Sequence, residues 1–110
     1  GIRRSIRPVG HICEFNGVGE RFRNQPWGIF GGQPGAAGTF EMVDCKGSTT
    51  SLSSKASRVK LSPDARVVIS TPGAGGYGAP EDRASKALAE DQASGKFTEG
   101  FLASNYARKD

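Results

Sequence analysis

Two glycine-rich segments contain most of the residues whose types and spacing could support chemistry. They are PWGIFGGQPGAAG at residues 26–38 and TPGAGGYGAPEDR at residues 71–83, and together they hold nine of the 16 glycines. A strand followed by glycines and a helix start is the arrangement that directs backbone amides at a phosphate. The second segment, however, lacks the Gly-Lys-Ser/Thr ending of a P-loop and the GxGxxG spacing of a dinucleotide site. We therefore interpret both segments first as structural loops, and second as loops near a ligand. The glycines expected to shape them are Gly28, Gly31, Gly32, Gly35, Gly73, Gly75, Gly76 and Gly78.

Three polar residues near the first glycine segment are candidates for contact with a ligand: Arg21, Arg23 and Gln33. Arginine binds anions in a bidentate manner, so these side chains could line the rim of a pocket. Arginines in loops also pair with carboxylates of a neighbouring chain, and that alternative stays open. Trp27 and Phe30 are expected to anchor the loop.

Other residues could ligate a metal or act in catalysis by their type, but they lack a supporting pattern. One histidine and two cysteines could ligate zinc, but their spacing matches no zinc signature, so no metal is predicted on this chain. No serine or cysteine occupies a nucleophile-elbow motif, and the paired carboxylates are expected on a solvated helix face. Catalytic residues are therefore unassigned. The residues concerned are His11, Cys13, Cys45, Glu81, Asp82, Glu90 and Asp91.

The composition predicts an ordered chain with a thin core. Only 21 of the 110 residues are Val, Ile, Leu or Phe. This share is just under the roughly 20% below which a chain struggles to fold alone. The net charge of +4 is too low for a disordered chain, so we expect the core to be completed against a partner. The basic first quarter lacks the motifs of a nucleic-acid-binding protein. No apolar run could span a bilayer, and a cytoplasmic protein with reduced thiols is expected.

The periodicity predicts an α+β fold, with a β-rich segment over residues 1–78 and a helix-turn-helix tail over residues 79–110. We expect extended structure up to Phe22, with a turn at 16–20 that places Phe15 and Phe22 on the two arms of a hairpin. A short strand is predicted at 39–43, and an exposed connection at 46–57.

A second hairpin is predicted over residues 57–70, where Ser62 to Ala65 has turn chemistry. Its inward residues would be Val59, Leu61, Val67 and Ile69. A helix is expected to begin at Pro80 and end at Gly95, and a second to follow Thr98, whose hydroxyl would cap it.

Several motifs follow one another along the chain: the Arg21–Phe22 pair, the strings PWGIFGGQPG and TPGAGGYG, and then Gly95, Thr98 and Tyr106. This arrangement is similar to the C-terminal end of the hydantoinase B/oxoprolinase family. The resemblance runs from about Ile2 to Tyr106. Alanine stands at position 74, where the family usually has glycine, and at position 79, where it usually has aspartate. These departures weaken any claim that the second loop supplies a catalytic side chain.

The resemblance implies a chain that acts in a hetero-oligomeric complex with larger hydantoinase B-like and hydantoinase A-like subunits. Such complexes use ATP and a divalent metal, neither expected on this chain, to phosphorylate a carbonyl or enolate oxygen. The first candidate activity of the complex is ketone carboxylation of the acetophenone or acetone carboxylase type. The second is hydrolysis of cyclic amides such as hydantoins or 5-oxoproline. A purely structural subunit and a free-standing basic binding module are the other hypotheses. The first residue, Gly1 rather than Met, fits a processed piece, an excerpt or a separately encoded small subunit.

Overall fold

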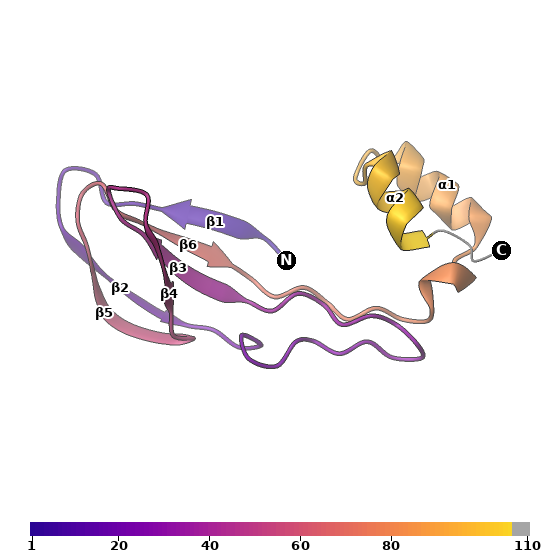
Figure 1. Ribbon diagram of the computed structural model, residues 1–110, viewed down its shortest axis with the longest axis horizontal. Coiled ribbons are helices and arrows are strands. Elements are labelled where there is room, and N and C mark those ends of the chain that lie inside the picture. Colours follow the sequence, from indigo (N-terminus) through magenta and orange to yellow (C-terminus); the bar gives the residue numbers. More distant parts are fainter. Residues whose placement is uncertain (107–110) are drawn as a thin grey trace.

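The structure, a computed structural model, describes residues 1–106 of the chain. The strands gather at one end of the molecule and the helices at the other, joined by extended segments (Figure 1). The fold is therefore α+β, rich in strands, with a C-terminal helical pair, as predicted. The last four residues of the expected tail lie outside the described residues. The elements are β1 (Arg3–Ile6), β2 (Cys13–Val18), β3 (Thr39–Val43), β4 (Thr49–Leu52), β5 (Lys55–Leu61), β6 (Arg66–Ser70), the 3₁₀ turn η1 (Pro80–Asp82), α1 (Ser85–Ala93) and α2 (Glu99–Tyr106).

The strands form two antiparallel sheets. The larger sheet has the order β1-β6-β3-β4, so β1 and β4 are its edges. The smaller sheet pairs β2 with β5. Because β5 and β6 follow each other in the chain but belong to different sheets, the connection between them joins the two sheets.

A small apolar core lies between the sheets. Val67, only 1% exposed, forms its centre with Leu61 and Ala65, and partly buried residues from both sheets pack against this cluster. Phe40 is also buried and meets the rings of Phe15 and Phe22 edge to face, with centroids 5.4 and 4.7 Å away. The buried apolar residues of the described chain are Phe40, Val43, Ala56, Leu61, Ala65, Val67 and Val68. Such a core is small for a chain of this length.

The hairpin predicted around residues 16–20 is wrong. Strand β2 continues through Asn16 and Gly17 to Val18, with an irregularity in its pairing to β5 between Phe15 and Gly17. Gly17 is needed for packing rather than for a turn, since a Cβ there would lie 2.6 Å from the Phe15 ring and 2.9 Å from the Phe40 ring. Gly17 in the sequence therefore marks a close approach of aromatic rings and not a turn.

The hairpin predicted over residues 57–70 is also wrong, although both of its strands exist. The turn forms, with the Ala65 amide donating to the Ser62 carbonyl at 3.0 Å. However, β5 pairs with β2, whereas β6 pairs with β1 and β3. Of the four residues predicted to point inward, Leu61 and Val67 are buried and the other two are partly buried.

The segment at 46–57 is not only a connection. It contains β4 and the start of β5, and β4 pairs with β3 at the edge of the larger sheet. Strand β3 covers Thr39–Val43, as predicted. The polar composition of β4 reflects its edge position, where most of its residues are exposed.

The C-terminal helices begin later than expected. Pro80 starts the separate turn η1, and the first α-helix begins only at Ser85. Gly95 follows the end of this helix with φ of 67°. Thr98 caps the second helix as predicted, since its Oγ1 accepts the Phe101 amide at 3.1 Å. Neither helix contains a buried residue.

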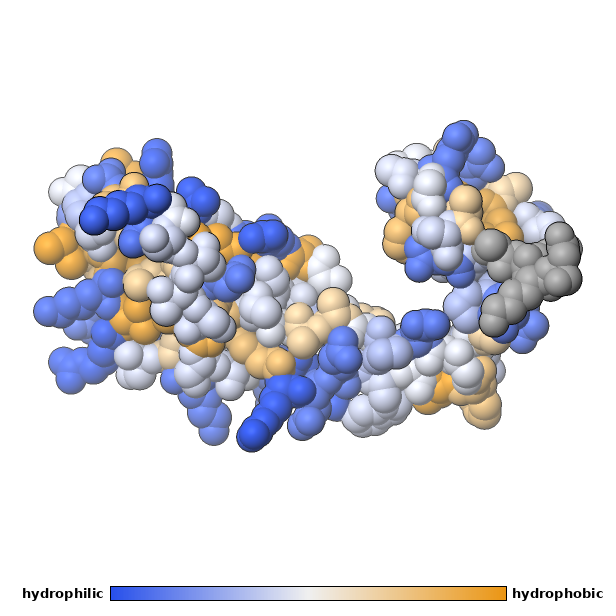
Figure 2. Space-filling model, in the orientation of Figure 1, coloured by the Kyte–Doolittle hydropathy of each residue, from blue (hydrophilic) through white to orange (hydrophobic). Residues whose placement is uncertain are grey.

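The molecule is elongated. Its radius of gyration is 18.4 Å and its principal extents are 56 × 27 × 19 Å. A compact domain of this length would have a radius of gyration of about 13 Å. Space-filling atoms show apolar groups at the surface of the strand-rich end and a hollow beside the helical pair (Figure 2). Within the described residues, no helix has the length and apolarity needed to cross a membrane.

Candidate functional site

The two glycine-rich segments lie against each other and form an extended projection from the sheets, which we call the glycine arm (residues 26–38 and 71–78; Figure 1). Backbone hydrogen bonds join its segments. The Gly73 amide donates to the Ala36 carbonyl at 2.9 Å, and the Gly76 amide to the Gln33 carbonyl at 2.8 Å. The first segment also folds back on itself, with the Gly35 amide donating to the Pro26 carbonyl at 2.8 Å.

Most glycines of the arm are required by close approach of backbones. A Cβ on Gly35 would lie 2.5 Å from the Ala74 carbonyl oxygen, and one on Gly73 would lie 3.1 Å from the Ala36 nitrogen. Cβ atoms on Gly28, Gly32 and Gly75 would overlap backbone atoms of Gly32, Gly76 and Trp27, respectively. Several of these glycines recur every three residues, the period of polyproline II chains, which pack closely only where glycine faces the neighbour.

This packing argues against a phosphate-binding role for the second segment. The Gly73, Gly76 and Gly78 amides all donate to carbonyl groups of the first segment, the last to Ile29 at 3.0 Å. A phosphate loop needs such amides free and directed at the ligand. The element that follows is the three-residue turn η1 rather than a long helix. The segment therefore packs as a structural loop.

The tip of the glycine arm exposes aromatic side chains. Phe30 and Tyr77 are 77% and 78% exposed, and their rings meet edge to face at 5.3 Å. Phe30 adopts φ of 50°, so the chain reverses with a residue in the left-handed region just before Gly31. Trp27 is also exposed. Large apolar groups gathered on a projection are typical of a surface that contacts another protein.

The structure does not bring the three predicted ligand-proximal residues into one cluster. The Arg21 guanidinium lies over the Trp27 ring, 4.6 Å from its centroid. Arg23 is exposed and lines none of the larger cavities. Gln33 lines a cavity that includes neither arginine.

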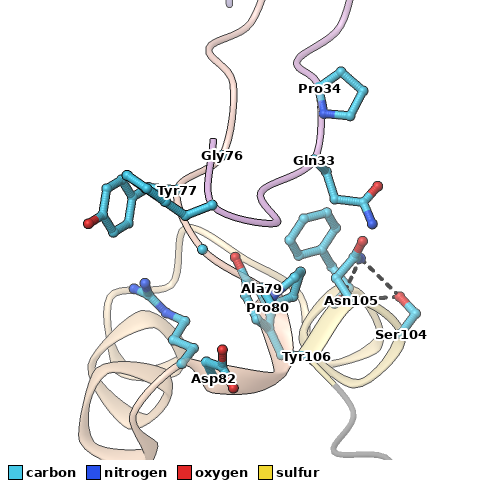
Figure 3. Close-up of a pocket in the computed structure, with 14 residues that line it drawn as sticks. Gln33, Pro34, Gly76, Tyr77, Ala79, Pro80, Asp82, Ser104, Asn105 and Tyr106 are labelled. Carbon is cyan, nitrogen blue, oxygen red and sulfur yellow. Dashed lines mark hydrogen bonds between the residues drawn. The ribbon is translucent and has the colours of Figure 1, made fainter. Parts of the chain in front are cut away.

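That cavity, of about 1000 Å³, lies between the glycine arm and the C-terminal helices (Figure 3). Gln33 enters from the arm, and Ser104 and Asn105 enter from α2. Aromatic residues contribute much of the remaining wall, among them Phe30, Tyr77 and Tyr106. The lining thus combines apolar rings with amide and hydroxyl groups.

Three polar side chains of the cavity, those of Arg83, Ser104 and Asn105, already have partners. The Asn105 amide donates to the Phe101 carbonyl at 2.8 Å, and the Ser104 hydroxyl donates to the Gly100 carbonyl at 2.8 Å. Arg83 forms an ion pair with Asp91 at 2.7 Å and lies 5.8 Å from the Tyr106 ring centroid. The arginine charge is therefore compensated locally, and the cavity contains no nucleophile hydrogen-bonded to a general base among the described residues.

The donor set for a metal is also dispersed. Within residues 1–106, no three side chains of His, Cys, Asp or Glu come together. The His11 Nδ1 pairs with the Val9 carbonyl at 3.0 Å, and Cys13 and Cys45 are both free. The described residues thus offer no group of three such side chains for the divalent metal that the family resemblance implies.

Sequence reasoning missed several residues of the site. Phe101, Tyr106 and Arg83 line the cavity although they lie far from the first glycine segment in sequence. The packing of the two glycine segments against each other was not predicted either, and their common three-residue glycine spacing was the available signal.

The geometry defines an elongated α+β segment with an exposed aromatic arm. A sequence model of the hydantoinase B/oxoprolinase family matches residues 1–80, so the chain belongs to the hydantoinase B/oxoprolinase family. Among curated proteins, "Uncharacterized protein MJ0963" of Methanocaldococcus jannaschii is 35% identical over 91 residues, covering 83% of this chain and 16% of the relative. The chain therefore spans about a sixth of that relative's length. No solved structure matches significantly.

Proposed function

We propose that this chain is a docking segment of an ATP-dependent hydantoinase B-type enzyme complex, either as the C-terminal part of a longer chain or as a small subunit. The exposed aromatic tip of the glycine arm carries this proposal, because Trp27, Phe30 and Tyr77 present large apolar surface on an elongated fold with a thin core. Burial of that surface against the larger subunits would supply the apolar contacts that the isolated chain lacks.

The chemistry of the complex is proposed to be the carboxylation of a ketone, of the acetophenone or acetone carboxylase type. ATP-dependent hydrolysis of a cyclic amide is the second candidate. ATP and a divalent metal would be held by the larger hydantoinase A-like and B-like subunits. Two observations support this: the described residues of this chain bring no three metal ligands together, and the Gly73, Gly76 and Gly78 amides already donate to carbonyl groups of the chain.

The experiment is co-expression of the chain with hydantoinase A-like and B-like subunits, followed by purification of the complex. ATP-dependent incorporation of labelled bicarbonate into acetophenone or acetone would support the carboxylase. ATP-dependent ring opening of hydantoin or 5-oxoproline would support the amidohydrolase instead. If the purified complex shows neither activity, the proposed chemistry is wrong.

The docking role is tested separately with Phe30→Asp, which places a charge on the aromatic tip while remaining compatible with a positive φ. Val18→Asp is the matched control, because Val18 is 80% exposed but lies at the end of β2, outside the arm. We expect Phe30→Asp to prevent co-purification and Val18→Asp to permit it. Equal behaviour of the two variants would contradict docking through the arm.

A structural role and a ligand-contacting role also make different predictions for Arg21, Arg23 and Gln33. Loss of activity in their alanine variants, with the complex still assembled, would support a role at the site. Loss of assembly alone would support a purely structural subunit.

A further inference from the structure

Strand β1 is an unpaired edge of the larger sheet. It pairs with β6 on one side, and no described strand pairs with its other side. All four of its residues are exposed. The sheet therefore presents a row of free backbone donors and acceptors at this edge.

The backbone groups at this edge can be assigned from the ladder. The Thr71 amide donates to the Ile2 carbonyl at 2.9 Å, so Ile2 bonds toward the β6 side. The register continues from this pair, with Arg4 opposite Ile69 and Ile6 opposite Val67. Since antiparallel residues alternate between bonding to one neighbour and to the other, the N–H and C=O groups of Arg3 and Ser5 point to the open side.

The side chains of β1 extend the apolar face of the sheet beyond the core. Ile2, Arg4 and Ile6 share one face of the strand, the face to which the neighbouring Val67 and Ile69 also belong. Ile2 and Ile6 are nevertheless 64% and 51% exposed. An added strand with apolar residues opposite these two would cover them.

Charge identifies the kind of strand that fits. Residues 1–13 contain three arginines and no acidic residue. Arg3 reaches Glu41 at 3.8 Å, whereas Arg4 and Arg7 have no ionic partner within residues 1–106. Antiparallel pairing of two copies of β1 would bring arginines together, and like charges on adjacent strands are destabilising. A second copy of this chain is therefore a poor occupant, and an acidic strand is a good one.

We infer that the free edge of β1 receives an extended acidic segment of a partner protein by β-strand addition. The segment carries an acidic residue flanked at the second position on either side by apolar residues, so that the acid faces Arg4 and the apolar residues cover Ile2 and Ile6. This surface meets the glycine arm only at its base, where Ile2 bonds to Thr71, and β1 lies at the strand-rich end, away from the tip of the arm (Figure 1). The inference therefore does not depend on the proposed enzyme chemistry or on docking through the aromatic tip.

The test uses a photo-crosslinking phenylalanine derivative in place of Ile6 in the full-length protein, irradiated in the producing cells, with mass spectrometry of the cross-linked peptide. The inference predicts one dominant cross-linked segment with the apolar–acidic–apolar alternation. Arg4→Glu should reduce the yield of this cross-link at least about fivefold, because it replaces an attraction with a repulsion.

Lys86→Glu is the matched control, since Lys86 is exposed on α1 and its replacement changes the net charge equally. Its cross-link yield should stay within about twofold of the parent. Cross-linking to a helix, to a basic segment, to nucleic acid or to a second copy of this chain would overturn the inference. So would the absence of a cross-link, or an equal yield from Arg4→Glu and Lys86→Glu.

Discussion

Replacement of Gly35 by alanine should loosen the glycine arm by an amount that follows from its packing. The added Cβ would lie 2.5 Å from the Ala74 carbonyl oxygen and 2.8 Å from its carbonyl carbon. Both are backbone atoms, so the two segments must separate by at least about 0.5 Å rather than rotate a side chain. Overpacking of this kind costs about 1–3 kcal/mol. Amide exchange through local opening should then accelerate roughly 5- to 150-fold.

The assay is hydrogen exchange with mass spectrometry on the assembled protein, followed at the Gly73 and Gly76 amides, which donate across the arm. Gly100→Ala is the control, because a Cβ at Gly100 meets nothing within 4 Å. Gly100 also lies within α2, where alanine is favoured over glycine by roughly 0.5–1 kcal/mol. Unchanged exchange at Gly73 and Gly76 in Gly35→Ala would refute the close packing of the two segments.

Two further substitutions test the core and the helical pair. Phe40→Ala removes a buried ring that meets two other phenylalanines. It should lower the free energy of unfolding of the assembled protein by about 3–5 kcal/mol, measured by urea titration. A loss below about 1 kcal/mol would contradict the core as described. Thr98→Ala should destabilise α2 by about 1 kcal/mol, because it removes the oxygen that accepts the Phe101 amide, whereas Thr98→Ser should be nearly neutral. Exchange at the Phe101 amide measures this difference, and equal exchange in the two variants would contradict capping.

Local patterns predicted individual elements well. The alternation around Phe40 predicted β3, and the hydroxyl of Thr98 predicted the start of α2. Both signals come from residues a few positions apart, so they can be recognised without knowing which distant segments become neighbours. The helix expected from Pro80 is wrong for a local reason, because Arg83 and Ala84 adopt extended ψ angles of 125° and 138° and separate the 3₁₀ turn from α1.

Pairing between distant segments could not be predicted in the same way. The turn at Ser62 to Ala65 suggested a hairpin, but a turn does not determine which strand becomes the neighbour, and β5 and β6 enter different sheets. Gly17 was interpreted as a turn residue, whereas contact with the rings of Phe15 and Phe40 explains it.

The candidate site shows the same limit. The glycines of the arm were recognised as special, but their partners lie some forty residues away. Each backbone approaches the other where glycine has no Cβ, as at Gly35 and Gly73. Arg21 was expected at a pocket rim, but its guanidinium lies over the Trp27 ring, and its backbone has a φ of 58° that the sequence does not reveal.

We propose that this chain completes its fold against a larger hydantoinase-type partner. Urea unfolding of the isolated 110-residue chain, followed by circular dichroism, tests this proposal most directly. The thin core and the exposed apolar arm predict a broad, non-cooperative loss of signal or aggregation for the isolated chain, and a cooperative transition when the partner is bound. A sharp transition of the isolated chain, with an unfolding free energy of about 5 kcal/mol or more, would contradict the claim.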